Sequence, residues 1–197
     1  MLTEFSVSCS KLKDMGRFMR YIDDDLSNKT ILITGGAGFI GSNLAFYFQR
    51  NHPGAKVVVL DSFRSGEKFS NGNLKSFGHF KNLLGFEGEM ISGDINDKNI
   101  LLDLEVNYTF DYIFHEAAIS DTTVQEQDLM IKTNVNAYKD LLDLAIKHNA
   151  NMIYASSAAT YGNAPSPQRV GREQPQNVYG FSKLSMDHLS REYMMKS

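Results

Sequence analysis

Cysteine is nearly absent from this 197-residue sequence, since Cys9 is its only one. One cysteine cannot form an intramolecular disulfide, which excludes a disulfide-stapled secreted domain. The N-terminus also lacks the apolar core of a signal peptide, and no stretch is long and apolar enough to span a bilayer. We therefore expect a cytoplasmic protein that has no membrane partner.

A strong charge of one sign is missing as well. The formal net charge is −3 and the basic residues are scattered, which argues against nucleic acid as a partner. With 42% hydrophobic and 22% charged residues, the composition is that of an ordinary globular protein of one domain or slightly more. Residues 1–28 show no clear periodicity and include the acidic run Asp23–Asp25. We expect them to form a solvated extension, followed by a folded domain over residues 29–197.

The most informative stretch runs from Thr30 to Gly41. It begins with the apolar residues 31–33, as expected for a strand buried on both faces of a parallel sheet. Gly35 permits a tight turn, Gly38 lets the backbone approach a pyrophosphate, and Gly41 lets a following helix pack closely. The free N–H groups at the start of that helix would then face an anion.

A second apolar strand, Val57–Asp61, follows the helix and ends in a carboxylate. Asp61 lies 20 residues after Gly41, where a dinucleotide-binding fold places the group that meets the adenosine ribose. Because strand, glycines, helix, strand and acid occur in this order, the sequence predicts dinucleotide binding.

The rest of the chain alternates between apolar runs and helical periodicity. Residues 62–88 are rich in Ser, Gly, Asn and Lys and predict a long loop with a short helix around 74–84. Further strands are predicted at 89–92, 112–115 and 152–155, with helices around 100–104, over 128–148 and from 177 onward. The predicted fold is α/β, a Rossmann-like doubly wound parallel sheet.

Three residues form a candidate catalytic group. Tyr179 and Lys183 stand four residues apart at the start of the last helix, so both side chains share one helix face. A cation beside the phenol favours the phenolate, which lets the tyrosine act as a base. Ser157 follows a strand end, where open α/β sheets bind ligands, and can hydrogen-bond to the same substrate hydroxyl.

Two other sites are rejected. His115-Glu116 resembles the start of a zinc-binding helix, but Ile119 stands where the second histidine would be, so no metal is expected. A hydrolase triad built on Ser157 fails because the glycines of a nucleophile elbow are absent.

The motifs resemble the extended short-chain dehydrogenase/reductase superfamily of nucleotide-sugar enzymes, which includes the NAD-dependent epimerases and dehydratases. Within it, three segments closely resemble the ADP-L-glycero-D-manno-heptose 6-epimerases. These segments are 114–123 with its double threonine, 154–162, and 177–183. The resemblance runs from about Met19 to the last residue.

The resemblance also implies cofactor contacts. Phe39 and Ile40 would cover the pyrophosphate, Asp61 and Ser62 would meet the ribose, and Lys68, helped by Lys81, would approach a 2′-phosphate. The remaining implied contacts are Glu116, Ala117, Ala118, Ile119, Ser120, Thr133 and Lys183. Asp61 alone argues for NAD, because a carboxylate repels a 2′-phosphate. The resemblance, with Arg64 and Lys68 nearby, argues for NADP, which we expect.

By resemblance, the enzyme inverts C6 of ADP-D-glycero-D-manno-heptose for the lipopolysaccharide core. Tyr179 would remove the C6 hydroxyl proton, a 6-keto sugar would form, and hydride would return to the other face. The family also uses a lysine from a C-terminal region as a second acid/base. That lysine, the last strands and the substrate domain have no counterpart here, so we expect a truncated chain that binds cofactor poorly and is inactive alone. The full-length protein is expected to be a homo-oligomer.

Two alternatives stay open. One is a 4-epimerase or 4,6-dehydratase acting on UDP- or dTDP-sugars, although dehydratases usually carry an acidic pair beside the serine, and here Ala158 and Ala159 follow Ser157. The other is a non-catalytic dinucleotide-sensing module, which would have no need for Ser157, Tyr179 and Lys183.

Overall fold

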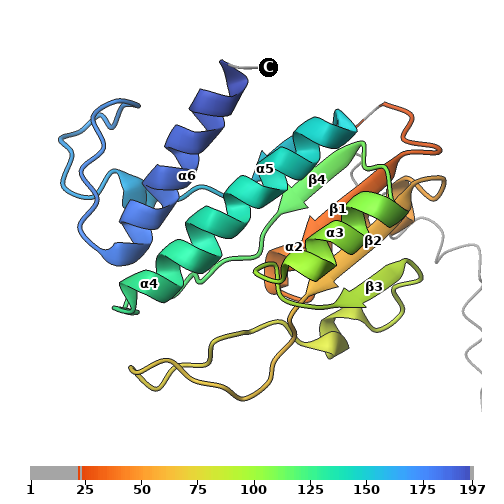
Figure 1. The fold of residues 1–197 in the computed structure, drawn as a ribbon, viewed down its shortest axis with the longest axis horizontal. Helices are drawn as coiled ribbons and strands as arrows, with labels where there is room; N and C mark the ends of the chain where they lie inside the picture. Colours follow the sequence, from red (N-terminus) through yellow and green to blue (C-terminus); the bar gives the residue numbers. More distant parts are fainter. Residues whose placement is uncertain (1–21, 23, 196–197) are drawn as a thin grey trace, which may run out of the picture.

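The computed structural model describes residue 22 and residues 24–195, so most of the expected N-terminal extension lies outside the described residues. Its centre is a five-stranded sheet in the order β3-β2-β1-β4-β5, and every neighbouring pair of strands is parallel (Figure 1). The strands are β1 (Thr30–Thr34), β2 (Lys56–Asp61), β3 (Glu89–Ser92), β4 (Tyr112–His115) and β5 (Asn151–Tyr154). All five strands occur within one residue of their predicted bounds.

Helices cover both faces of the sheet, which confirms the doubly wound α/β prediction (Figure 1). Helices connect all consecutive strands except β2 and β3, which are joined by a loop with a short 3-10 turn. The α-helices are α2 (Phe39–Asn51), α3 (Lys98–Asn107), α4 (Gln127–Met130), α5 (Ala137–His148) and α6 (Val178–Met194). A π-helical segment, Ile131–Asn136, joins α4 to α5, so the single helix predicted over 128–148 contains a local widening of the helical turn.

The core is divided between the two faces by the alternation of side chains along each strand. In β1, Leu32 packs with Leu101 of α3 and Leu141 of α5. Its neighbours Ile31 and Ile33 point the other way and pack with α2. Near β5, α6 packs on α5 through a separate cluster that includes Tyr138 and Met186. This packing places α6 beside the end of β5.

Two expectations about the less regular segments need correction. The helix predicted around 74–84 is only a short 3-10 turn, Phe80–Leu83, because residues 67–75 instead fold back on themselves through a bridge between Lys68 and Leu74. Leu26, within the stretch expected to be solvated, is 4% exposed and packs with the core on the α2 side. In the described part of the chain, no helix is both long enough and apolar enough to cross a membrane.

Candidate active site

A cleft of about 400 Å³ lies at the carboxyl ends of the central strands. Open α/β sheets bind ligands at this edge. Most of the residues expected at a cofactor line it. They are Gly35, Gly38, Phe39, Ile40, Gly41, Asp61, Ser62, Glu116, Ala117, Ala118, Ile119, Ser120 and Thr133.

The glycine turn after β1 brings two loops into close contact. Gly35 has a φ of +68°, and a Cβ there would lie 2.6 Å from the backbone nitrogen of Ala117. At Gly38 a Cβ would meet only the Gly35 carbonyl oxygen, at 3.1 Å, so this glycine keeps space on the cleft side. α2 begins directly after Gly38, with no side-chain cap and no acidic residue in its first turn. Its first N–H groups are thus available to an anion, and the site fits a dinucleotide pyrophosphate.

Asp61, at the end of β2, is 6% exposed and ties the glycine turn to the strand. Its carboxylate oxygens accept hydrogen bonds from the backbone nitrogens of Ala37 (2.9 Å) and Phe63 (2.7 Å). Burial raises the pKa of Asp61, and the two N–H donors oppose that effect. Its position in the cleft wall agrees with a contact to a ribose.

The basic residues expected near a 2′-phosphate are outside the set of residues that line this cleft. Lys68, Lys81 and Arg64 are exposed and are not among the residues that line the cleft. Lys75 does line it, with its ammonium 3.1 Å from the Glu67 carboxylate. Asp94, two residues after the end of β3, is another lining residue that sequence reasoning did not assign to the site.

α6 brings the predicted base and its cation to the end of β5. Lys183 is 3% exposed, and its Nζ donates a hydrogen bond to the Ala155 carbonyl oxygen at 2.8 Å. The same nitrogen lies 6.0 Å from the centroid of the Tyr179 ring. Burial lowers the pKa of Lys183 to about 8, against the opposing charges of Glu116 and Asp187. Lys183, Tyr179 and Ser157 are not among the lining residues, but Glu116, which acts on Lys183, is one of them. A buried lysine with so low a pKa is typical of a functional site.

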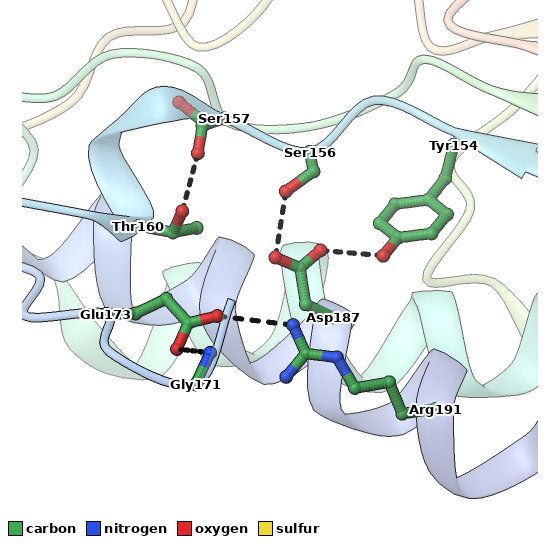
Figure 2. Close-up of polar contacts among 8 residues, drawn as sticks. All are labelled: Tyr154, Ser156, Ser157, Thr160, Gly171, Glu173, Asp187 and Arg191. Carbon is green, nitrogen blue, oxygen red and sulfur yellow. Dashed lines mark hydrogen bonds and ion pairs between the residues drawn. The ribbon is translucent and has the colours of Figure 1, made fainter. Parts of the chain in front are cut away.

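Ser157 lies two residues beyond Ala155, at the start of a 3-10 turn over Ala158–Thr160. Its hydroxyl accepts a hydrogen bond from the Ala159 nitrogen at 3.1 Å. Its carbonyl oxygen accepts one from the Thr160 hydroxyl at 2.8 Å (Figure 2). In the structure as described, no hydrogen bond joins Ser157 to Tyr179 directly. Ser157 follows β5 and Tyr179 lies in the first turn of α6; the link between the two segments is the hydrogen bond from Lys183 to Ala155.

Asn134 is a further residue that sequence reasoning missed. It lies in the π-helical segment, is 0% exposed, and its amide binds both backbone groups of Ile119, with distances of 2.8 Å and 3.0 Å. The same amide donates to the Ser182 hydroxyl at 3.0 Å. Asn134 thereby joins the cleft loop to α6 next to Lys183. A polar residue within an apolar helix pattern was the available signal.

The surroundings of His115 indicate a structural role rather than a functional one. Its Nδ1 lies 2.7 Å from the Thr34 hydroxyl, and burial lowers the pKa of His115 to about 3. Among residue 22 and residues 24–195, no group of three or more His, Cys, Asp or Glu side chains is arranged to hold a metal ion.

Comparisons with known proteins agree with this geometry. Residues 31–197 match the model of the NAD dependent epimerase/dehydratase family. The chain is similar to the ADP-L-glycero-D-manno-heptose-6-epimerase of Helicobacter pylori, with 58% identity and a TM-score of 0.81 over 89% of this chain and 54% of that chain. It is also similar to a UDP-Glc/GlcNAc 4-epimerase of Campylobacter jejuni, with 25% identity and a TM-score of 0.71 over 86% of this chain and 50% of that one.

A third similar structure is the UDP-glucose 4-epimerase of Brucella ovis in complex with NAD, with 29% identity and a TM-score of 0.67 over 85% of this chain and 48% of that one. The chain thus spans about half the length of these relatives. With the family match extending from β1 to the end of the sequence, the chain belongs to the NAD dependent epimerase/dehydratase family.

Proposed function

We propose that this chain is the cofactor-binding part of a nucleotide-sugar epimerase that inverts C6 of ADP-D-glycero-D-manno-heptose in lipopolysaccharide core synthesis. The observation that carries the reaction type is the position of Tyr179 and Lys183 on α6, with Lys183 bonded to the β5 end beside the cleft. The choice of sugar rests on similarity, because identity is 58% to the heptose epimerase and 25% and 29% to the two 4-epimerases.

Three residues of this chain would act at the sugar hydroxyl, each in a different role. Tyr179 takes the hydroxyl proton as the carbon is oxidised. The acid/base for reduction on the other face of the ketone would be the C-terminal lysine that the family resemblance implies. The Lys183 ammonium stabilises the phenolate through its charge. Ser157 donates a hydrogen bond to the substrate oxygen and orients it. Because the sugar is first oxidised and then reduced, the net redox change is zero.

NADP is the proposed cofactor. When bound, its nicotinamide supplies a reversible acceptor for hydride from the sugar carbon. The glycine turn and the first turn of α2 would hold the pyrophosphate, and Asp61 would meet the ribose. Lys75, the basic residue in the cleft wall, would contact a 2′-phosphate in place of Lys68. We propose that the full-length protein is a homo-oligomer in the cytoplasm.

The test is an epimerisation assay followed by proton NMR. It would use the 197-residue chain and a fusion of this chain to the C-terminal part of the Helicobacter pylori enzyme, each supplied with NADP. ADP-D-glycero-D-manno-heptose, UDP-glucose and a dTDP-sugar would be compared as substrates. We expect the fusion to invert only the heptose and the 197-residue chain to be inactive.

Tyrosine variants of the fusion identify the base. Tyr179→Phe should abolish turnover, whereas Tyr193→Phe, a control on the same helix that loses a hydrogen bond to Asp143, should not. Turnover of UDP-glucose in preference to the heptose would favour the 4-epimerase alternative. Cofactor binding without turnover of any sugar would favour a sensing module.

A further inference from the structure

Asp187 lies on α6 one turn after Lys183 and is the centre of a polar cluster outside the cleft. One oxygen of its carboxylate accepts a hydrogen bond from the Tyr154 hydroxyl at 2.6 Å, and the other accepts one from the Ser156 hydroxyl at 3.0 Å (Figure 2). Tyr154 is the last residue of β5, and Ser156 directly precedes Ser157. The carboxylate therefore holds two points of the strand end that leads into the candidate active site.

The spacing along α6 explains this arrangement. Tyr179, Lys183 and Asp187 are each four residues apart, so all three lie on one helix face. Lys183 donates to the carbonyl of Ala155, and Asp187 accepts from the residues on either side of it, Tyr154 and Ser156. The three successive residues 154–156 are thus hydrogen-bonded to the side chains of Lys183 and Asp187 on α6. This pattern fixes the register between α6 and the segment that carries Ser157.

Asp187 also has an electrostatic effect on the lysine. The groups that face Lys183 are His115 and Glu116 at the end of β4, together with Tyr179 and Asp187 on α6. Among the described groups, the charges of Glu116 and Asp187 raise the pKa of Lys183 and so oppose the effect of burial. Asp187 itself faces Tyr154 of β5, while Arg191, one turn further on, is 3.2 Å from the Glu173 carboxylate (Figure 2).

We propose that Asp187 is a positioning residue for this reaction, which holds the strand end bearing Ser157 against α6 and supplies a negative charge facing the Lys183 ammonium. The proposal rests on the proposed function for its catalytic consequence. Its structural and electrostatic parts concern groups within this chain and can be measured without any substrate.

The first experiment measures the titration of the Lys183 side chain by NMR in the 197-residue chain. Asp187→Asn keeps the shape of the side chain but removes its charge, so the pKa of Lys183 should fall below its wild-type value of about 8. The matched control is Asp143→Asn on α5, which also removes a carboxylate that accepts from a tyrosine hydroxyl, at 2.7 Å from Tyr193, but does so at an exposed position. This control should leave the Lys183 titration unchanged.

A second variant keeps the charge and removes the hydrogen bonds. Tyr154→Phe with Ser156→Ala leaves Asp187 in place without its two partners from the strand end. In the fusion, this double variant should lower kcat on the order of ten- to a hundredfold, because misplacement of the groups around the substrate is costly. Because the proposed role of Lys183 needs its ammonium form, activity should be lost at alkaline pH as this group releases its proton. In the double variant, which keeps the Asp187 charge, this loss should occur near the wild-type pH. With Asp187→Asn, kcat should fall and the alkaline loss should move to lower pH.

The outcomes separate the two claims. An unchanged Lys183 titration in Asp187→Asn would overturn the electrostatic role whether or not the protein acts on a sugar. A wild-type kcat in the double variant would overturn the positioning role. If the fusion turns over no sugar, the proposed function fails, and the Lys183 titration still decides whether Asp187 acts on the lysine.

Discussion

Replacing Lys183 with methionine should stabilise the fold at neutral pH. The lysine is 3% exposed, and the only hydrogen-bond acceptor found for its Nζ among the described residues is the Ala155 carbonyl oxygen. Methionine has a similar length and no charge, so it fills the same space without burying an ammonium. Lys183 therefore lowers the stability of the fold, as residues at functional sites commonly do.

The size of the effect follows from the pKa. A change from 10.5 to about 8 corresponds to about 3 kcal/mol, at roughly 1.4 kcal/mol for each pKa unit. At pH 7 the lysine is protonated in both the folded and the unfolded chain, so the whole burial cost is present. The variant leaves the Ala155 carbonyl without its donor, which costs about 1 kcal/mol. The expected net gain in the free energy of unfolding at pH 7 is about 2 kcal/mol.

The gain should depend on pH in a defined direction. Between pH 8 and 10.5 the folded protein has released the Lys183 proton while the unfolded chain still holds it. The unfolded state then binds more protons, so the wild-type protein becomes more stable relative to the variant as pH rises. The advantage of Lys183→Met should shrink over this range and disappear by about pH 10.5.

Urea unfolding followed by circular dichroism at pH 7, 9 and 10.5 measures these differences. Lys139→Met, at an exposed position on α5, is the control and should change stability little at any of these pH values. A methionine variant that is less stable at pH 7, or whose difference from wild type is the same at all three pH values, would refute the reasoning.

Four further variants test other parts of the structure. Gly38→Ala should fold normally but bind NADP at least tenfold more weakly in a fluorescence titration, because the new methyl group faces the cleft; Gly41→Ala, whose Cβ would lie 2.4 Å from the Gly35 carbonyl oxygen, should fail to fold stably. His115→Gln should flatten the acid dependence of stability in urea unfolding, since neutral His115 contributes stability above pH 6.5 that is lost as pH falls toward 3. Asn134→Ala should lower the free energy of unfolding by about 3 kcal/mol, because it leaves both buried backbone groups of Ile119 without a partner; a loss below 1 kcal/mol would contradict that role.

The parts of the fold that the sequence predicted well are those governed by local pattern. β1 is a short apolar run that stops just before Gly35, and β2 is one that ends at Asp61, so their bounds follow from burial and turn chemistry alone. The same holds for α6, where the spacing of Tyr179 and Lys183 already placed both side chains on one face.

The parts that were not predicted depend on contacts between distant segments. The loop after β2 is held by the side chains of Asn71 and Asn73, which both donate to the carboxylate of Asp121 almost fifty residues later. No local pattern reports that pairing, so the sequence indicated a helix around 74–84 and did not single out Lys75 as a residue of the cleft. Asn134 was missed for the same reason, because its hydrogen-bond partners, Ile119 and Ser182, lie in other parts of the sequence.

The central claim is that the sugar carbon is oxidised and reduced again at the site formed by Tyr179, Lys183 and Ser157. Its most direct test is to run the epimerisation of ADP-D-glycero-D-manno-heptose by the fusion in D₂O and to examine C6 of the product by NMR. If hydride leaves and returns within the site, the product keeps protium at C6. Deuterium at C6 would mean that a base removes the carbon-bound hydrogen as a proton, and that result would contradict the account.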